Sequence, residues 1–319
     1  MDYVTYNGQK FEVEHNEIVI NNKEILNIGA IKGLENLINL NSLDLRNNNI
    51  VDITGLNHNI NLEYLDLEEN KIKELKGLDS LLNLRYLKLD HNNIKKIENL
   101  RNLKKLEILH VESNQLYKID GLEKLENLVK LYLGYNNISE IEGLDSLRKL
   151  KILHLNNNII KEIQNFSEDL YRLEGLNLSN NQITEIKGLD ELLKLMLLNL
   201  NENNISEIKN LDELITLNAL NLGKNQLMEI KDLKSLENLI KLDLSDNKIS
   251  HLRGLEHLKN LRILNLKNNK ISEVEELVSL PNLIQINLEN NPVPEDQIRK
   301  LNEKINFNRK NLKRRSFEI

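Results

Sequence analysis

Residues 40–61 read LNSLDLRNNNIVDITGLNHNIN, and residues 62–83 read LEYLDLEENKIKELKGLDSLLN, with leucine, isoleucine and asparagine at matching positions. The shared pattern returns at steps of 22 residues as far as residue 293, with a single step of 23. One asparagine marks the same position in every copy: Asn48, Asn70, Asn92, Asn114, Asn136, Asn158, Asn181, Asn203, Asn225, Asn247, Asn269 and Asn291. A fixed period of this length predicts a solenoid of twelve stacked repeats.

Each repeat contains a short alternating segment that predicts a β-strand. In Leu43-Asp44-Leu45 the two leucines face the interior and Asp44 faces the open side. Ile50 and Ile53 point into the same interior from the turns that bring the chain around. One repeat cannot bury these side chains alone, but stacking turns them into a core at about 25 cal/mol per Å² of apolar surface.

The repeated asparagine is polar but stands between apolar positions, so we expect its amide to be buried. A buried amide without hydrogen-bond partners costs about 1 to 3 kcal/mol. We therefore interpret the twelve asparagines as a structural ladder that bridges the backbones of neighbouring repeats. The extra residue between Asn158 and Asn181 falls in the segment 164–172, and we place it in a turn away from the strands.

This pattern resembles the short, 22-residue class of leucine-rich repeats. It is similar to the leucine-rich regulatory subunit of type 1 protein phosphatase and to the repeat regions of bacterial internalins. The resemblance covers about four fifths of the 319 residues. It implies an α/β fold: a right-handed solenoid with a curved parallel sheet on its concave face. Proteins of this family bind many different partners, so the fold alone does not identify the partner.

We divide the chain into three parts. Residues 1–31 form an N-terminal cap made of a hairpin and an atypical first coil, residues 32–293 form twelve leucine-rich repeats, and residues 294–319 form a helical cap with a basic tail. Terminal caps are expected because the end of a stacked core would otherwise be exposed.

Local signals support both caps. Asn7-Gly8 lies between alternating apolar residues and predicts a tight hairpin turn. After two prolines the phase ends, and Ile298 and Ile305 share one face of a predicted helix. The basic run at 309–315 is either a solvated tail or an element that contacts nucleic acid, a membrane or a docking partner, and we interpret it as a solvated tail.

Composition excludes several classes of protein. The chain contains no cysteine, which excludes disulfides, thiolate zinc sites and thiol nucleophiles. The first residues show no signal segment, and no stretch approaches the length of a membrane span. We therefore expect a cytoplasmic protein and a monomer. The net charge of −6 argues against a nucleic-acid partner.

The sequence contains no motif for catalysis or for a cofactor. A phosphate-binding loop, a dinucleotide glycine motif and a nucleophile elbow are all missing. His110 and His154 share a strand position but lie two repeats apart, about 9.5 Å at the usual strand spacing, which is too far for one metal ion. We expect a protein that is not an enzyme, without a cofactor, a metal or a small-molecule substrate.

The outward positions of the strands hold the candidate partner-binding residues. Large exposed apolar side chains are not needed for folding there, and tyrosine is common in binding hot spots. An aromatic and aliphatic strip is predicted from Tyr64, Tyr86, Ile108, His110, Tyr132, Tyr135, Ile152 and His154. An acidic zone is predicted from Asp44, Asp66, Glu68, Asp90 and Glu112. Two alternatives remain open: the tyrosines pack along the sheet, and the asparagine column of the last six repeats is a neutral, soluble surface.

These observations favour a protein-interaction scaffold that binds a protein on its concave face. The acidic zone would attract a partner with a basic surface. The family resemblance implies a regulatory subunit and makes a phosphatase one candidate partner. The alternative is an internalin-like surface adhesin or secreted effector that binds a host receptor. A nucleic-acid partner would need a basic groove, whereas the predicted face is acidic.

Overall fold

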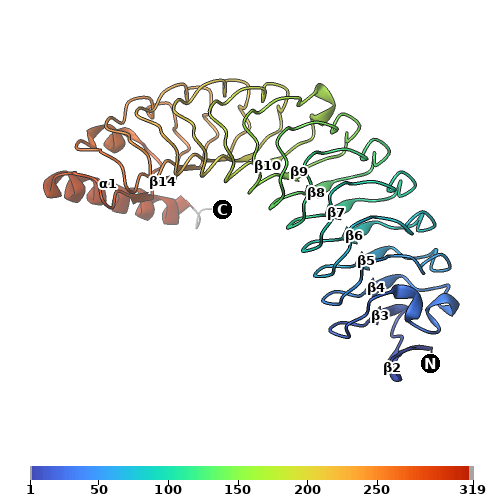
Figure 1. Ribbon diagram of the computed structural model, residues 1–319. Helices are drawn as coiled ribbons and strands as arrows, with labels where there is room; N and C mark the ends of the chain where they lie inside the picture. Colours follow the sequence, from blue (N-terminus) through green and yellow to red (C-terminus); the bar gives the residue numbers. More distant parts are fainter. Residues whose placement is uncertain (1, 316–319) are drawn as a thin grey trace. The chain divides into compact units, whose positions relative to one another are not determined.

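The computed structural model describes residues 2–315, with side chains described as far as Lys310. Two compact units, Met1–Ile159 and Ile160–Ile319, make up the chain. Each unit is a stack of repeats, and in each the strands lie on the inner side of the unit's curve (Figure 1). Within each unit, the strands of successive repeats pair in parallel. The predicted solenoid with a parallel sheet is thus confirmed.

The first unit begins with an antiparallel hairpin and continues with seven parallel strands. The hairpin consists of β1 (Tyr3–Tyr6) and β2 (Gln9–Glu12). The parallel strands are β3 (Glu17–Val19), β4 (Ser42–Asp44), β5 (Tyr64–Asp66), β6 (Tyr86–Lys88), β7 (Ile108–His110), β8 (Lys130–Tyr132) and β9 (Ile152–His154). Leu43 pairs with Leu65 and Leu65 with Leu87, so equivalent residues of successive repeats form columns across the sheet.

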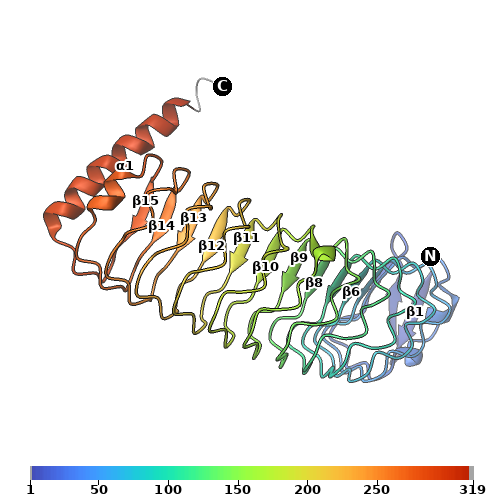
Figure 2. The same cartoon turned by 90° about the horizontal axis from the view of Figure 1, so that it is seen from above.

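The second unit holds six parallel strands and a terminal helix. The strands are β10 (Gly175–Asn177), β11 (Leu197–Asn199), β12 (Ala219–Asn221), β13 (Lys241–Asp243), β14 (Ile263–Asn265) and β15 (Gln285–Asn287). Helix α1 (Glu295–Arg315) follows and lies beside the end of this stack (Figure 2). In the part of the chain that the structure describes, α1 is the only α-helix. The outer sides of the repeats are turns with four short 3-10 helices, Ile28–Ala30, Leu34–Asn36, Glu168–Leu170 and Glu275–Ser279.

A left-handed residue ends the strand segment of every repeat. The residue before each ladder asparagine has a φ of 50° to 59°, from Asn47 to Asn290. This conformation costs least for glycine and asparagine, and asparagine is common there. The reversal turns the chain away from the sheet and aims the next side chain, the ladder asparagine, into the interior.

The core consists of aliphatic layers, one layer for each repeat. In the second repeat Leu62, Leu65, Leu67, Ile72 and Leu75 are completely buried. The same positions are buried in the other repeats before the last, where Ile286 and Leu288 are only partly buried, so the period of the sequence follows from the need to fill every layer. Replacing one of these leucines by alanine costs about 2 to 5 kcal/mol, because the neighbouring layers cannot close over the cavity.

The ladder asparagines lie between consecutive layers. Asn48 through Asn269 retain only 7% to 9% of their accessible surface. The Asn136 amide nitrogen donates to the carbonyl of Val111 in the preceding repeat at 2.8 Å and to that of Leu133 at 3.1 Å. Its amide oxygen accepts from the backbone N–H of Leu116 at 2.9 Å. One side chain therefore satisfies backbone groups of two repeats.

The two ends of the chain differ from the regular repeats. Asn7 and Gly8 both have positive φ and form the predicted turn of the hairpin, which packs Val4 into the interior. Strand β3 belongs to the atypical first coil, where the backbone N–H of Lys23 donates to the Asn48 amide oxygen at 2.9 Å. The hairpin thus precedes a coil that is joined to the regular stack by the same ladder.

Helix α1 covers the last repeats of the second unit. Leu301 and Ile305 are buried, and the Asn308 amide nitrogen donates to the carbonyl of Leu283 at 2.9 Å. These contacts confirm the predicted helical cap. The side chains of residues 311–315 and all of residues 316–319, which belong to the predicted basic tail, lie outside the described residues. No helix within residues 2–315 is long and apolar enough to cross a membrane.

We predict that Asn136→Ala lowers the free energy of unfolding by about 2 to 4 kcal/mol, because it leaves buried backbone groups of two repeats without partners. The adjacent Asn137 is exposed and makes no side-chain hydrogen bond within the described chain, so Asn137→Ala is the matched control and should cost less than about 0.5 kcal/mol. Chemical denaturation of both variants measures the difference. Equal destabilisation would contradict a structural role for the ladder.

Candidate functional site

The outward side chains of strands β4 to β9 form the strand face of the first unit. Each strand contributes its first and third residue to this face, while its central leucine points inward and is buried. The parallel register places equivalent residues side by side, so contacts across the face join residues 22 positions apart.

The first cluster on this face is built around a buried carboxylate. Tyr64 and Tyr86 lie in adjacent strands with ring centroids 6.4 Å apart. The Tyr64 hydroxyl donates to Asp66 at 2.9 Å, and the Lys88 ammonium lies 3.5 Å from the same carboxylate and 3.7 Å from that of Glu68. Asp66 is thereby enclosed by a hydroxyl, a cation and the backbone N–H of Glu68, and its side chain is only 1% exposed.

Burial and the negative charge of Asp66 determine the direction in which the pKa values of this cluster are shifted. Desolvation, together with the hydrogen bond to Asp66, raises the pKa of the Tyr64 hydroxyl. Desolvation and the charge of Asp66 also raise the pKa of Glu68. Burial lowers the pKa of Lys88, but its contacts with Tyr64, Asp66 and Glu68 outweigh that effect and raise the pKa overall. Lys88 is therefore a charged partner that neutralises the acidic side chains around it.

The second cluster is a stack of three rings from three successive strands. The rings of His110 and Tyr132 are stacked with centroids 4.1 Å apart, and Tyr132 meets His154 edge-on at 4.8 Å. All three side chains are half-buried. His110 Nδ1 lies 3.3 Å from Asp90, which fixes one end of the stack. The three rings form one contiguous aromatic cluster, in which His110 and Tyr132 are stacked and His154 is nearly perpendicular to Tyr132.

The stack and its surroundings are partly desolvated. Burial, and then the charge of His110, lowers the pKa of His154. Burial, followed by the charge of Glu112, raises the pKa of Tyr132. Burial and the charge of Asp90 raise the pKa of Glu112 itself. Next to it, a Cβ on Gly134 would lie 2.7 Å from a Glu112 carboxylate oxygen, so the glycine leaves room for this carboxylate beside the stack.

The acidic column is less open than the alternation of the strands predicts. The side chains of Asp44, Asp66 and Asp90 are 12%, 1% and 11% exposed. They turn back along the sheet, where Asp44 and Asp66 each accept from the backbone N–H two residues later. Each also lies close to a basic side chain: Asp44 is 3.1 Å from Arg46, Asp66 is 3.5 Å from Lys88, and Asp90 is 3.3 Å from His110. The expectation that Asp44 is open to solvent is therefore wrong, and the equivalent Asp66 is covered too. Asp90, which lies two residues after the same column, is also covered.

The other predicted residues are distributed over the face. Ile108 and Ile152 are half-exposed, but the register places Lys130 between them, so they do not form a continuous apolar strip. Tyr135 lies in the turn after β8 and is 56% exposed. It makes no ring contact with the stack in the part of the chain that the structure describes. Aromatic contacts therefore join Tyr64 with Tyr86 in one pair. In the other cluster, Tyr132 contacts both His110 and His154.

The asparagine column of the second unit has a local role of its own. The side-chain oxygens of Asn199, Asn221 and Asn265 each accept from the backbone N–H two residues later, at 3.1, 3.0 and 3.3 Å. The Asn265 amide nitrogen also donates to Asp243 at 2.9 Å. A side-chain oxygen at this position supports the strand end, which explains why Asp and Asn recur there.

Two interactions, one on the strand face and one at the residues that precede the strands, were not predicted from the sequence. Lys88 covers Asp66, and Arg85 donates to Glu107 through two nitrogens at 2.7 and 3.0 Å. The two residues of each pair are 22 positions apart in the sequence. Residues with this separation lie side by side in neighbouring repeats, so opposite charges there can form an ion pair. That spacing is the signal that would have revealed them.

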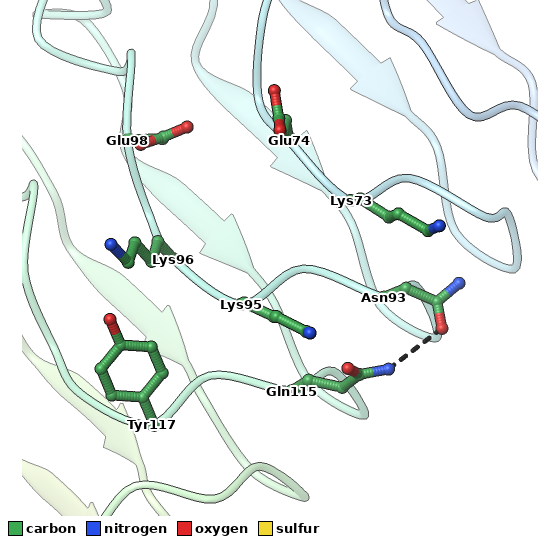
Figure 3. A pocket seen from close by; sticks show the side chains of 8 residues that line it. All are labelled: Lys73, Glu74, Asn93, Lys95, Lys96, Glu98, Gln115 and Tyr117. Atoms are coloured by element: carbon green, nitrogen blue, oxygen red, sulfur yellow. Dashed lines mark hydrogen bonds between the residues drawn. The ribbon is translucent and has the colours of Figure 1, made fainter.

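A depression separate from the strand face lies in the segments that follow the ladder asparagines Asn70, Asn92 and Asn114. Its volume is about 670 Å³, and its wall consists of Lys73, Glu74, Asn93, Lys95, Lys96, Glu98, Gln115 and Tyr117. Gln115 donates to Asn93 at 3.2 Å. The ends of Lys73 and Lys95 point to one side, and Lys96 points away from them (Figure 3). The polar groups do not converge on one point, and both signs of charge are mixed.

The repeat pattern and the ladder can now be compared with known proteins. A family model described as Leucine Rich repeats (2 copies) matches residues 38–80, 60–102, 82–124, 126–168 and 237–277, which together exceed half of the chain. The chain is a leucine-rich repeat protein. Leucine-rich repeat solenoids are typically protein-interaction scaffolds and are generally not enzymes.

Solved structures with the same architecture include proteins of Listeria monocytogenes and Leptospira interrogans. The internalin InlF of Listeria monocytogenes is 30% identical, with 86% of this chain and 87% of that chain covered and a TM-score of 0.69. A leucine-rich repeat protein of Leptospira interrogans is 27% identical, with coverages of 90% and 81% and a TM-score of 0.75. No curated protein matches the chain in sequence.

The functional domain of InlJ from Listeria monocytogenes shares the fold alone. It is 24% identical, with 88% of this chain and 64% of that chain covered and a TM-score of 0.67. That domain includes a cysteine ladder. This leucine-rich repeat protein has no cysteine, and its ladder is made of asparagine.

We predict that Lys88→Met lowers the free energy of unfolding by about 1 to 3 kcal/mol, because the buried Asp66 carboxylate loses its cation while the apolar part of the side chain is kept. Lys130→Met is the matched control, since Lys130 lies on the same face and forms no salt bridge within residues 2–315. Urea denaturation distinguishes the two. If both variants retain wild-type stability, Lys88 does not hold this cluster together.

The lowered pKa of His154 predicts a pH-dependent stability. The unfolded chain takes up this proton more readily than the folded chain, so folded stability is lost as the pH falls below the ordinary value of 6.5. In His154→Gln the melting temperature should therefore fall less than in the wild type between about pH 7.5 and about pH 5.5. Glu68 and Glu112 are present in both chains, so the difference reports on His154. Identical falls would show that this histidine does not contribute.

Proposed function

We propose that the strand face of the first unit binds a protein partner and that this leucine-rich repeat protein is a non-enzymatic scaffold. The observation that carries this proposal is the stack of His110, Tyr132 and His154. Rigid rings bury a large area at little cost in side-chain entropy, and their polar edges still find hydrogen-bond partners. Such a stack on the inner side of a curved unit suits a protein surface that fits into the curve.

The repeats themselves provide the comparison that makes this stack informative. In the second unit the same column holds Asn199, Asn221 and Asp243, and those repeats have the same strands and the same buried leucines. Stacking of the repeats thus does not require aromatic rings at this position. Half-buried rings on the outward face that the fold does not need support a binding surface.

Tyr135 supports the same conclusion from backbone conformation. It has a φ of 54°, in the left-handed region, where a bulky side chain is unfavourable. Asn47 and Asn157 occupy the equivalent position in other repeats with nearly the same φ. A residue that is kept in an unfavourable conformation and remains exposed points to a functional use of its side chain.

The charge of the face indicates the kind of partner. Asp44, Asp66 and Asp90 are covered, so the attraction of a basic partner would come from exposed carboxylates beside the face, at Glu69 and at Glu63, which lies 3.8 Å from Arg85. These groups would speed encounter with a positively charged protein surface. The resemblance to the leucine-rich regulatory subunit of type 1 protein phosphatase makes that phosphatase the first partner to test, in the cytoplasm.

A second candidate function is favoured by the likeness to InlF. In this alternative the protein is an internalin-like surface adhesin or secreted effector that binds a host receptor with the same face. The two functions differ in where the protein is found. Fractionation of cells that produce the protein would place a cytoplasmic scaffold inside the cells and an adhesin or effector at their surface or in the medium.

Site-specific photocrosslinking tests the proposed face and identifies the partner. A benzophenone amino acid is introduced at Tyr135, and in a separate chain at Lys224, which occupies the equivalent exposed turn position of the second unit. A partner of the proposed face should be crosslinked from position 135 and not from position 224. The purified partner, or the purified phosphatase, is then titrated with the variants.

We predict that Tyr132→Ala weakens binding of that partner about 30-fold or more, because losing the central ring of the stack removes about 2 kcal/mol of contact energy. Asn221→Ala changes the same column in the second unit and serves as the control, with wild-type affinity expected. Wild-type affinity for Tyr132→Ala, or equal crosslinking from both positions, would refute the proposal.

A further inference from the structure

An exposed apolar patch lies in the second unit, where the turn segments lead into β11, β12 and β13. We name it the flank patch, and it consists of Leu193, Met196, Leu197, Ile215 and Ile240. Each of these side chains retains 39% to 56% of its accessible surface. The patch is separate from the strand face of the first unit.

The five side chains belong to three successive layers. The Thr216 hydroxyl donates to the carbonyl of Leu193 at 3.0 Å, which joins the turn of Leu193 to the turn of Ile215. The backbone N–H of Asn218 donates to Met196 at 2.9 Å, and that of Ile240 donates to Asn218 at 2.8 Å. The layers are therefore in direct contact along the whole patch.

The fold does not require apolar residues at these positions. In the next two repeats, the place of Leu193 and Ile215 is taken by Glu237 and Lys259, which are exposed, and the buried leucines of those repeats are unchanged. Apolar residues also stand at the Leu193 position in the first unit, at Ile60 and Leu82, but the flank patch adds exposed apolar side chains at the Met196 position, where Glu174 and Arg262 stand in other repeats. An apolar group of this size that the fold does not require indicates an interaction site.

An acidic border runs along one side of the patch. Two carboxylates precede Leu193 and two precede Ile215, and all four are exposed: Asp190, Glu191, Asp212 and Glu213. Asp212 accepts from the Ser235 hydroxyl at 3.0 Å. Within the described part of the chain, Asp190, Glu191 and Glu213 form no salt bridge. An apolar surface with an uncompensated acidic edge is complementary to an apolar surface with a basic edge.

The sheet beside the patch restricts the form of the partner. β11, β12 and β13 are each paired with a strand on both sides, so they offer no free edge to an extended peptide. A partner segment must therefore satisfy its own backbone hydrogen bonds, as a helix does. Apolar residues at i, i+3, i+4 and i+7 would form one stripe of such a helix.

We propose that the flank patch binds an amphipathic helix whose apolar stripe is bordered by lysine or arginine. The apolar stripe contacts Leu193, Ile215 and Met196, and the basic border faces the carboxylates on the outer side of the same turns. This site is independent of the partner-binding face proposed for the first unit, and either can hold if the other fails.

The test uses the full chain and a fluorescent helical peptide of about 18 residues with a leucine stripe and flanking lysines. A scrambled peptide of the same composition and a peptide with glutamate in place of lysine are the comparison probes. We predict that both bind at least about tenfold more weakly in anisotropy titrations. The double variant Leu193→Glu/Ile215→Glu should lose binding of the basic peptide, and Glu191→Lys/Glu213→Lys should weaken it at least about tenfold.

The first unit supplies the matched control. Ile60 and Leu82 occupy the positions of Leu193 and Ile215 and are also exposed, but the turns before them carry only one carboxylate, Asp79. Ile60→Glu/Leu82→Glu should bind the peptide like the wild type. Glu237 shows that glutamate is compatible with the equivalent position of another repeat, so both double variants should fold. Circular dichroism checks that they do. Equal binding of the scrambled peptide, or equal loss in both double variants, would overturn the proposal.

Discussion

The amide of the ladder asparagine is the interaction on which the remaining structure depends. At the end of every strand the chain turns inward, and the backbone groups there would be buried without partners. Asn92 shows the solution: its nitrogen donates to Leu67 and Leu89, and its oxygen accepts from Ile72. An aliphatic residue would fill the same space but leave these groups unsatisfied, at about 1 to 3 kcal/mol each. The ladder therefore both closes each repeat and joins it to the one before.

Because the leucine layers and the ladder hold the repeats together, the outward positions are free to vary. The first unit uses this freedom for His110, Tyr132 and His154, whereas the second unit places asparagine or aspartate in the same column. The flank patch shows the same freedom on another surface. Both proposed binding surfaces thus consist of side chains that the packing of the interior does not constrain. The residues at equivalent positions in other repeats show which side chains are compatible with the fold.

The period of the sequence predicted most of the fold, since an aliphatic residue is needed at each buried position of every layer. It also placed His110, Tyr132 and His154 side by side, because residues 22 positions apart lie in adjacent strands. It did not predict that Asp66 would be buried, since alternation describes the direction of the Cβ atom and not the cover provided by Tyr64 and Lys88. Ring orientations and lateral ion pairs depend on side-chain rotamers, which the repeat pattern does not contain.

The central claim is that the interior determines the fold and that the aromatic residues of the strand face do not. Chemical denaturation of one variant chain tests this claim. The chain carries Tyr86→Ala, His110→Asn and Tyr132→Asn, and each substitution introduces a residue that the same column holds in the second unit. We expect the unfolding transition to remain cooperative and the free energy of unfolding to fall by less than about 1 kcal/mol for each of the three substitutions. A loss of about 3 kcal/mol or more at each position, as for a core leucine, would contradict it.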